Sequence, residues 1–283
     1  MFDDVSGMTP QRATLLATLV RQCSVLLDEG VGMDAAQRLL HKRGIGVLDA
    51  ILVTRQLLGG GPGTLADAKK TVLTSPVRIT ELRDHHQLVD TFERAQDIAN
   101  TVLALPPAVA GTRIVAIDGA GGSGKTTLAG TAAELLDGCP IVAGDDFYRP
   151  MPEQERKRLD AEQGYQRYFD WQRLRDQVLV PLRAGRAARY QRFAWATGEL
   201  GPGHEVTPTP VVIVEGVYTA RPELAPYYHL TVYVDAPREI CLQRMRARGQ
   251  NPEQWITRWR AAEDHYLRTT WPQTRANLVV KGH

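Results

Sequence analysis

The nine residues from Gly119 to Thr127, GAGGSGKTT, constrain this sequence more than any other feature. They fit the pattern G-x-x-x-x-G-K-[ST] of a phosphate-binding loop. The segment before them, Arg113 to Asp118, is short, apolar and β-branched, which predicts a buried parallel strand. The segment after them, Leu128 to Leu136, is rich in alanine and leucine, which predicts a helix. A strand, a glycine loop and a helix in this order form the context that such a loop requires.

We expect this loop to bind the phosphates of a nucleotide. Glycines let backbone N–H groups converge on a phosphate without clashes from Cβ atoms, and the helix N-terminus adds partial positive charge. Lys125 can reach the terminal phosphates, and the Thr126 hydroxyl can ligate Mg²⁺. The predicted nucleotide-binding residues are Gly119, Gly121, Gly122, Ser123, Gly124, Lys125, Thr126 and Thr127.

The composition excludes several classes of function. The chain has 283 residues, enough for two domains or one large one, and at 43% hydrophobic residues it can bury a core. Its net charge is only +2 and no basic tail is present, which argues against nucleic acid and membranes as partners.

Three cysteines, Cys23, Cys139 and Cys241, lie far apart, which gives neither a zinc spacing nor a disulfide framework and suits a reducing compartment. The acidic start, Met1 to Asp4, lacks the basic region of a signal peptide, and the apolar run from Ala13 to Val20 is too short to span a bilayer. We therefore expect a cytoplasmic protein.

The first 107 residues predict a small helical domain of unknown role, and residues 108–283 predict a second domain. Apolar residues recur at helical spacing, and Pro106-Pro107 ends the last helix and marks the expected boundary. The expected helices begin at Pro10 and then cover residues 34–42, 47–58, 65–73 and 80–105.

The sequence of this first domain gives no argument for a catalytic or binding site. Gly59 to Gly63 predicts a helix–helix connection and not a second phosphate loop, because no lysine-threonine pair follows. His85 and His86 point about 100° apart on a helix, so we expect a solvated pair and not a metal site. Ile45 to Val72 resembles the paired helices of the C-terminal domain of the bacterial ribosomal stalk protein, which indicates shape and not a ribosomal role.

Carboxylates follow two predicted strands of the second domain. Asp145 and Asp146 come after the strand from Pro140 to Ala143, and Glu215 follows the strand from Val211 to Val214. Ligands of open α/β sheets bind at the carboxyl ends of the strands. A kinase needs one carboxylate to accept a hydroxyl proton and another near the metal, whereas an aspartate at a strand end can also simply cap the next helix.

From about residue 112 to 283 the chain resembles the uridine kinase and phosphoribulokinase family of P-loop kinases. The resemblance implies an α/β fold with a five-stranded parallel sheet flanked by helices, and the use of ATP and Mg²⁺. It further implies that Asp145 is the general base, that Tyr148 lies in the acceptor pocket, that Asp170 hydrogen-bonds sugar hydroxyls, and that Glu215 organises Mg²⁺ through water. The residues that carry it are Gly119 to Thr127, Gly144 to Arg149, Phe169-Asp170, Val211 to Gly216 and Ala276 to Val280.

A segment from Ala188 to Trp195 alternates polar and apolar residues, which predicts a strand or hairpin, and Thr197 to Pro210 is rich in glycine and proline, which predicts a loop. Relatives carry an acid near position 194, where this chain has alanine. Arg189 and Arg192 then lack a nearby acid, so they either face an anionic substrate or are solvated.

The helix after Asp235-Ala236-Pro237 carries Arg244 and Arg248 four residues apart, on one face. Arginines at this point resemble the lid of P-loop small-molecule kinases, and a solvated basic helix is the alternative. We expect Trp255, Trp259 and Trp271 to pack this helical end of the domain, and a role around the adenine is the alternative.

The sequence thus predicts transfer of the γ-phosphoryl group of ATP to a hydroxyl, with Asp145, Lys125, Arg244 and Arg248 as catalytic residues. The acceptor is expected to be a small molecule, a nucleoside such as uridine or cytidine first, and pantothenate, a sugar phosphate or an antibiotic otherwise. A rival hypothesis is a P-loop ATPase switch whose first domain grips a protein partner. The sequence leaves open whether the protein forms a homo-oligomer.

Overall fold

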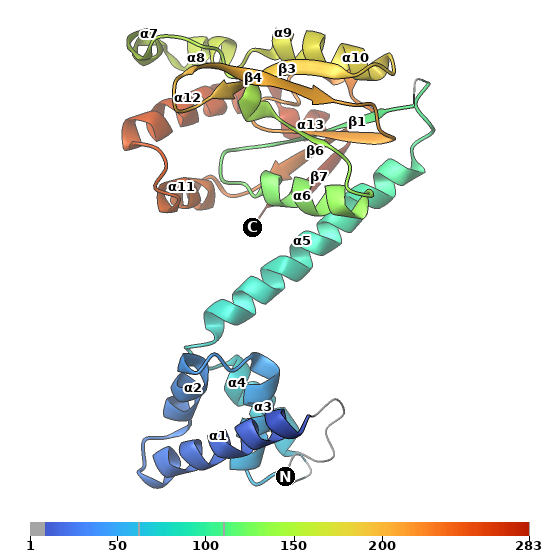
Figure 1. The fold of residues 1–283 in the computed structure, drawn as a ribbon. Helices are drawn as coiled ribbons and strands as arrows, with labels where there is room; N and C mark the ends of the chain where they lie inside the picture. The colour runs from blue at the N-terminus through green and yellow to red at the C-terminus, as the bar shows by residue number, and fades with distance from the viewer. Residues whose placement is uncertain (1–8, 62, 110, 283) are drawn as a thin grey trace. The chain divides into compact units, whose positions relative to one another are not determined.

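The chain forms two compact units, Met1–Leu88 and Val89–His283 (Figure 1). The computed structural model describes residues 9–61, 63–109 and 111–282, without the side chains of residues 79–86 and 88. The side chains of His85 and His86, for which a solvated pair was expected, lie outside this description.

The first unit is helical, as expected. Thr9 caps α1 by accepting a hydrogen bond from the Arg12 N–H at 3.3 Å, and Pro10 occupies the first turn, where its fixed φ fits. Leu16, Leu19 and Cys23 share the buried face of α1, in the core of this unit. The helices of this unit are α1 (Pro10–Asp28), α2 (Met33–Lys42), α3 (Val47–Leu57), α4 (Thr64–Leu73) and the first turns of α5 (Ile79–Ala104).

The last turns of α5 belong to the second unit. Ala95, Ile98, Ala99 and Val102 are fully buried in a core that also contains residues of the sheet. The division between the units therefore falls inside α5, between Leu88 and Val89, and not at the expected boundary of 107/108. Pro106-Pro107 ends the helix, but the apolar residues of α5 between Ala95 and Val102 are buried in the second unit.

The second unit is built on five parallel strands in the order β2-β5-β1-β6-β7, which confirms the predicted sheet. All strand pairs in it are parallel, so every strand ends at the same edge. The β-branched composition of β5 suits a strand that is buried on both faces. The strands are β1 (Arg113–Gly119), β2 (Ile141–Ala143), β5 (Val211–Glu215), β6 (Leu230–Asp235) and β7 (Leu278–Lys281).

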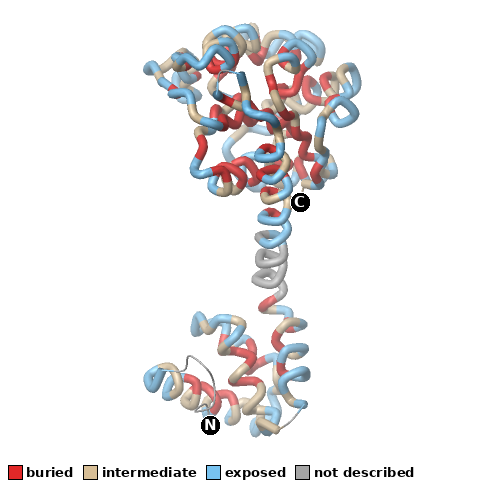
Figure 2. The backbone as a smooth tube through the Cα atoms, turned by 90° about the vertical axis from the view of Figure 1, so that its right-hand side faces the viewer, coloured by how far each residue is buried: buried red, intermediate tan, exposed pale blue. Residues whose placement is uncertain are grey.

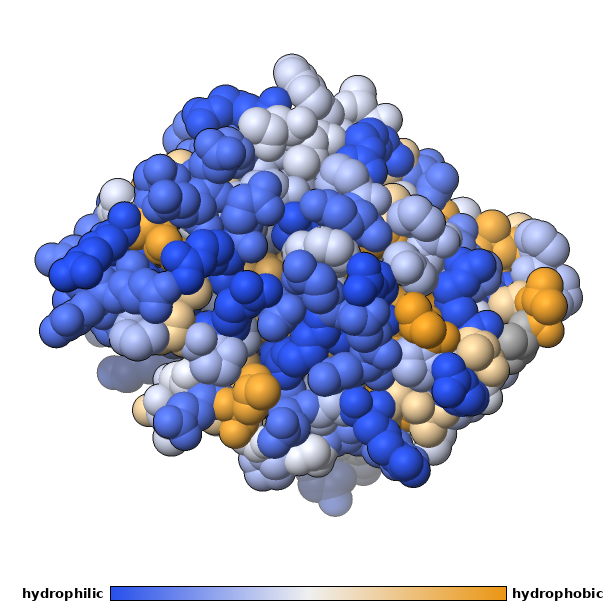
Figure 3. Space-filling model, turned by 90° about the horizontal axis from the view of Figure 1, so that it is seen from above, coloured by the Kyte–Doolittle hydropathy of each residue, from blue (hydrophilic) through white to orange (hydrophobic). Residues whose placement is uncertain are grey.

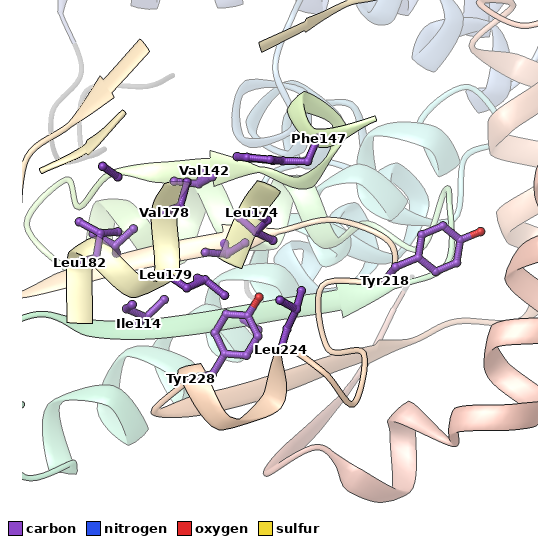
Figure 4. Close-up of a cluster of buried hydrophobic side chains, with 14 of the residues drawn as sticks. Ile114, Val142, Phe147, Leu174, Val178, Leu179, Leu182, Tyr218, Leu224 and Tyr228 are labelled. Atoms are coloured by element: carbon purple, nitrogen blue, oxygen red, sulfur yellow. The ribbon is translucent and has the colours of Figure 1, made fainter. Parts of the chain in front are cut away.

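Alternate residues of β1 and β5 enter two different cores, because successive side chains point to opposite faces of a sheet. Ile114 and Val212 join the core beneath α9 (Trp171–Leu174), the π-helical η2 (Arg175–Leu179) and α10 (Val180–Arg183), which Figure 4 shows. Val115 and Ile213 join the core with α5 and α6 (Lys125–Leu135). Figure 2 shows buried segments in both units.

A β-hairpin replaces part of a segment that we expected to be a loop. β3 (Ala188–Ala194) pairs antiparallel with β4 (Glu199–Val206), so the prediction of a loop over Thr197 to Pro210 was wrong for β4. Pro202 is tolerated there because both strands of a two-stranded sheet are edge strands. The pairing register shifts between Gln191 and Phe193, as it does at a β-bulge, where one strand has an extra residue.

The remaining elements lie in the connections between the strands. They are η1 (Gly144–Phe147), α7 (Glu153–Arg158), α8 (Ala161–Arg167), η3 (Ala225–Tyr227), α11 (Arg238–Ala247), α12 (Glu253–Thr270) and α13 (Pro272–Arg275). The face seen in Figure 3 is mostly hydrophilic, with hydrophobic side chains in small separate groups. None of the described helices is long and apolar enough to cross a membrane.

We expect Ile98→Ala to lower the free energy of unfolding of the second unit by about 3 kcal/mol, because it leaves a cavity in a packed core. The exposed neighbour Asn100→Ala serves as the control and is expected to change it by less than about 0.5 kcal/mol. Tryptophan fluorescence during urea unfolding measures this unit alone, because all five tryptophans lie in it. Equal effects of the two substitutions would mean that α5 does not pack on the sheet.

Candidate active site

The phosphate loop connects the end of β1 to the start of α6 and is covered closely by α11. Gly122 has a φ of +83°, a left-handed conformation that favours glycine. A Cβ atom at this position would lie 2.5 Å from the backbone oxygen of Cys241 on α11. Glycine at position 122 is therefore required both by the turn and by the contact with the helix.

Residues of the loop are divided between its interior and its open side. Ser123 is fully buried, and its N–H donates to the Ala120 carbonyl at 3.0 Å. Lys125 lies with its Nζ 3.5 Å from the same carbonyl oxygen. Thr126 and Thr127 are exposed in the first turn of α6. The open side thus presents a lysine, hydroxyl groups and the N-terminus of a helix, which together favour an anion.

A cavity of about 450 Å³ lies over this loop. It brings together side chains from the ends of β2 and β5, from the hairpin and from α11 and α12, which lie far apart in the sequence. The predicted site residues that line it are Gly121, Gly122, Lys125, Thr126, Asp145, Tyr148, Glu215 and Arg248.

Thr126 and Glu215 form an oxygen pair beside Lys125. The Thr126 hydroxyl donates to Glu215 Oε2 at 3.3 Å, and the carboxylate closes strand β5 with only 8% of the residue exposed. Burial raises the pKa of Glu215, and the charge of Lys125 acts against that rise. A hydroxyl and a carboxylate are the hard oxygen ligands that Mg²⁺ prefers, so these two residues fit the predicted metal site.

No group of three or more His, Cys, Asp or Glu side chains among the described residues could hold a metal ion by itself.

The two adjacent aspartates of η1 have different surroundings. Asp145 is exposed and faces the cavity. Asp146 pairs with Arg192 at 3.3 Å and accepts a hydrogen bond from the Tyr190 hydroxyl at 3.4 Å. Burial raises the pKa of Asp146, and Arg192 lowers it. Of these two aspartates, Asp145 is therefore the one that can contact a substrate in the cavity.

Arg244 and Arg248 contact the site in different ways. Arg244 Nη1 donates to the Gly122 carbonyl at 3.2 Å, so it holds the loop from outside the cavity. Arg248 lies at the end of α11 and lines the cavity itself. Of the two, Arg248 has the position expected of a lid arginine.

Three predicted substrate-binding residues do not line this cavity. Asp170 caps α9 by accepting from the Arg173 N–H at 3.3 Å and pairs with Arg149 at 3.3 Å. Arg192 pairs with Asp146, as described above.

The third, Arg189, is 78% exposed and pairs across the hairpin with Glu205 at 2.7 Å. The expectation that Arg189 and Arg192 lack a nearby acid was wrong, because Glu205 follows in β4 and Asp146 comes from η1.

An aromatic wall of the cavity was not predicted in full. Trp195, just past β3, and Trp259, on α12, lie beside Tyr148, and all three line the cavity. The ring centroids of Tyr148 and Trp195 are 4.8 Å apart, and those of Trp195 and Trp259 are 5.5 Å apart. Trp259 was expected to pack the helical end or to lie around the adenine, and no spacing in the sequence relates it to Tyr148.

Asp118 is a further group that the sequence did not single out. It is fully buried at the end of β1 and accepts hydrogen bonds from the Tyr266 hydroxyl at 2.6 Å, the Ala220 N–H at 2.8 Å and the Gly119 N–H at 2.6 Å. Burial raises its pKa to about 6, against the effect of these donors. The carboxylate ties the phosphate loop to α12 and to the segment after β5.

A phosphate loop between a parallel strand and a helix, with carboxylates at the neighbouring strand ends, defines a P-loop kinase. The chain belongs to the Phosphoribulokinase / Uridine kinase family, whose model matches residues 114–282.

Among the relatives is a uridine kinase of Borrelia duttonii (strain Ly), 27% identical over 165 residues, or 56% of this chain and 76% of that protein. Another is nicotinamide riboside kinase 2 of Mus musculus, 28% identical over 138 residues, or 48% of this chain and 67% of that protein. The structure of a possible uridine kinase from Bacillus stearothermophilus superposes with a TM-score of 0.53 at 25% identity, over 66% of this chain and 97% of that chain. The protein is thus an ATP-dependent kinase that transfers phosphate to a hydroxyl.

The raised pKa of Asp118 predicts a pH-dependent stability. The folded state binds this proton more tightly than the unfolded state, so the contribution of Asp118 is greatest below about pH 4 and is lost as the pH rises to about 6. The difference between 3.8 and about 6 corresponds to about 3 kcal/mol.

Urea unfolding followed by tryptophan fluorescence between pH 4 and 7 measures this contribution. We expect the free energy of unfolding of Asp118→Asn to fall less over this range than that of the unchanged protein. The comparison uses the change in the free energy of unfolding with pH and not its absolute value, because asparagine also changes the hydrogen bonds made at position 118. Parallel curves for the two proteins would show that Asp118 keeps an ordinary pKa.

Proposed function

We propose that this kinase phosphorylates a hydroxyl of a nucleoside of the uridine or cytidine type. The observation that carries the proposal is that the aromatic wall and Asp145 share one cavity with the phosphate loop. A nucleoside has a planar base, which stacks on aromatic faces, and a ribose with hydroxyls for transfer. The relatives named above, a uridine kinase and a nicotinamide riboside kinase, support this class of acceptor.

At the nucleotide end, the backbone N–H groups of the loop and Lys125 hold the triphosphate of ATP. Thr126 and Glu215 hold Mg²⁺, directly or through water. The bound ion would neutralise charge that develops on the phosphates during transfer. Arg248 adds a positive charge at the cavity wall near the transferred group.

At the acceptor end, Asp145 accepts the proton of the attacking hydroxyl. The oxygen of that hydroxyl forms a bond to the γ-phosphorus while the bond between the γ-phosphorus and the β–γ bridging oxygen breaks. The products are ADP, the phosphate ester and the released proton. Asp146 keeps its charge paired with Arg192 and does not take part. Most of the acceleration comes from positioning and charge stabilisation, because phosphoryl transfer requires no covalent step on the protein.

Asp145→Asn is expected to lower turnover by at least about a hundredfold and to leave ATP affinity within about threefold, since it removes only the proton acceptor. The matched control is Asp146→Asn, which changes the neighbouring carboxylate and should lower turnover by less than about tenfold. ADP release and equilibrium binding of ATP measure the two quantities. Unchanged turnover in Asp145→Asn would remove this residue from the mechanism.

Lys125→Ala is expected to weaken ATP binding itself, by about tenfold or more, because it removes the charge beside the terminal phosphates. Equilibrium binding of ATP measures this loss directly. Unaltered binding and turnover would contradict nucleotide binding at this loop.

Trp195→Ala is expected to raise the KM for a nucleoside acceptor by about tenfold and to leave the KM for ATP unchanged, because stacking contributes about 1–3 kcal/mol per base. The assay compares ADP release with uridine, cytidine, pantothenate, sugar phosphates and hydroxylated antibiotics. Preferred turnover of an acceptor without a planar ring would contradict the nucleoside proposal. Slow hydrolysis that is indifferent to every acceptor but is stimulated by a protein would favour an ATPase switch instead.

A further inference from the structure

A carboxylate from outside the predicted motifs contacts the phosphate loop. Glu263 on α12 is only 5% exposed and lines the cavity. Its Oε1 accepts a hydrogen bond from the backbone N–H of Gly121 at 3.2 Å. The contact joins residues 142 positions apart in the chain.

The contact is close and leaves no spare room. A Cβ atom on Gly121 would lie 3.1 Å from Glu263 Oε1 and 3.1 Å from the Met245 sulfur. The carboxylate is therefore fitted against the loop, between α11 and α12, and does not approach it as a flexible surface side chain.

A negative charge at this point opposes the loop's function, because the loop receives an anionic triphosphate. At a separation of several ångströms in a partly buried site, two like charges repel by several kcal/mol unless a cation compensates them. Arg238, at the start of α11, supplies that cation: its Nη1 lies 3.0 Å from Glu263 Oε2. Arg238 also pairs with Asp264, whose side chain is 41% exposed.

We propose that Glu263 and Arg238 form a charge-compensated clamp on the phosphate loop. Glu263 holds the Gly121 peptide, and Arg238 neutralises the carboxylate so that the loop can still accept the phosphates of ATP. Both are positioning residues that act through the loop. The inference rests on the proposed binding of ATP at this loop.

The clamp also connects the loop to the helix that carries the arginines of the site. Arg238 begins α11, Arg244 on the same helix binds the Gly122 carbonyl, and Arg248 at its end lines the cavity. The position of Arg248 relative to the phosphates therefore depends on the pairing of Arg238 with Glu263.

Glu263 is not a second general base in this arrangement. One carboxylate oxygen accepts from Gly121 and the other pairs with Arg238, so both are engaged. Asp145 is the exposed carboxylate of the same cavity.

Suppression of one substitution by another tests the clamp. Arg238→Gln leaves the Glu263 charge uncompensated beside the loop, and we expect it to weaken ATP binding by about tenfold or more. Adding Glu263→Gln removes that charge but keeps the oxygen that accepts from Gly121, so the double variant should bind ATP within about threefold of the unchanged protein. The matched control adds Asp264→Asn to Arg238→Gln, and no recovery is expected because Asp264 does not contact the loop.

Equilibrium binding of ATP by the full chain is measured for each variant, with thermal unfolding to establish that each is folded. If Arg238→Gln does not fold, Arg238→Met replaces it in the same scheme. A double variant that binds as weakly as Arg238→Gln, or equal recovery with Asp264→Asn, would overturn the clamp. If instead Lys125→Ala binds ATP as well as the unchanged protein, the result contradicts the proposed binding of ATP at this loop and not the proposed clamp.

Discussion

The parallel register of β1, β5 and β2 determines where every functional group of the kinase unit lies. Ile117 of β1 and Ala143 of β2 both pair with Glu215, so β2 and β5 end at the same level and β1 runs two residues further, to Gly119. The phosphate loop follows β1, Asp145 follows β2, and Glu215 is the last residue of β5. A slip of one residue in β5 would turn Glu215 to the opposite face of the sheet, where its hydrogen bond from Thr126 could not form.

The close covering of the loop by α11 and α12 explains how a glycine-rich segment holds one conformation. The Gly122 peptide lies against Cys241, the Gly122 carbonyl accepts from Arg244, and the Gly121 N–H donates to Glu263. Each contact comes from a residue more than a hundred positions further along the chain. The backbone amides are therefore arranged before a nucleotide binds, and preorganised donors lose little free energy to reorganisation when charge develops.

Local patterns in the sequence predicted the strands of the parallel sheet, the phosphate loop and most helices, because hydrophobic periodicity and glycine spacing are local properties. The pairing of charges was not predictable in the same way. Arg189 and Arg192 showed no acid among their immediate neighbours, yet Glu205 and Asp146 reach them through the hairpin and η1. Likewise, Pro106-Pro107 indicates the end of a helix, but only the folded chain shows that α5 is buried on the sheet.

The hairpin links the choice of acceptor to the geometry of catalysis. From β3, Tyr190 and Arg192 hold Asp146, and just beyond the same strand Trp195 contributes the wall beside Tyr148. Asp145 adjoins Asp146 in η1, so a shift of β3 that adapts the wall to another ring also moves the carboxylate that accepts the proton. Since Trp195 remains 43% exposed, the wall itself can adjust, whereas Asp146 is held by its ion pair with Arg192. Substitutions in this hairpin should therefore alter turnover and acceptor affinity together.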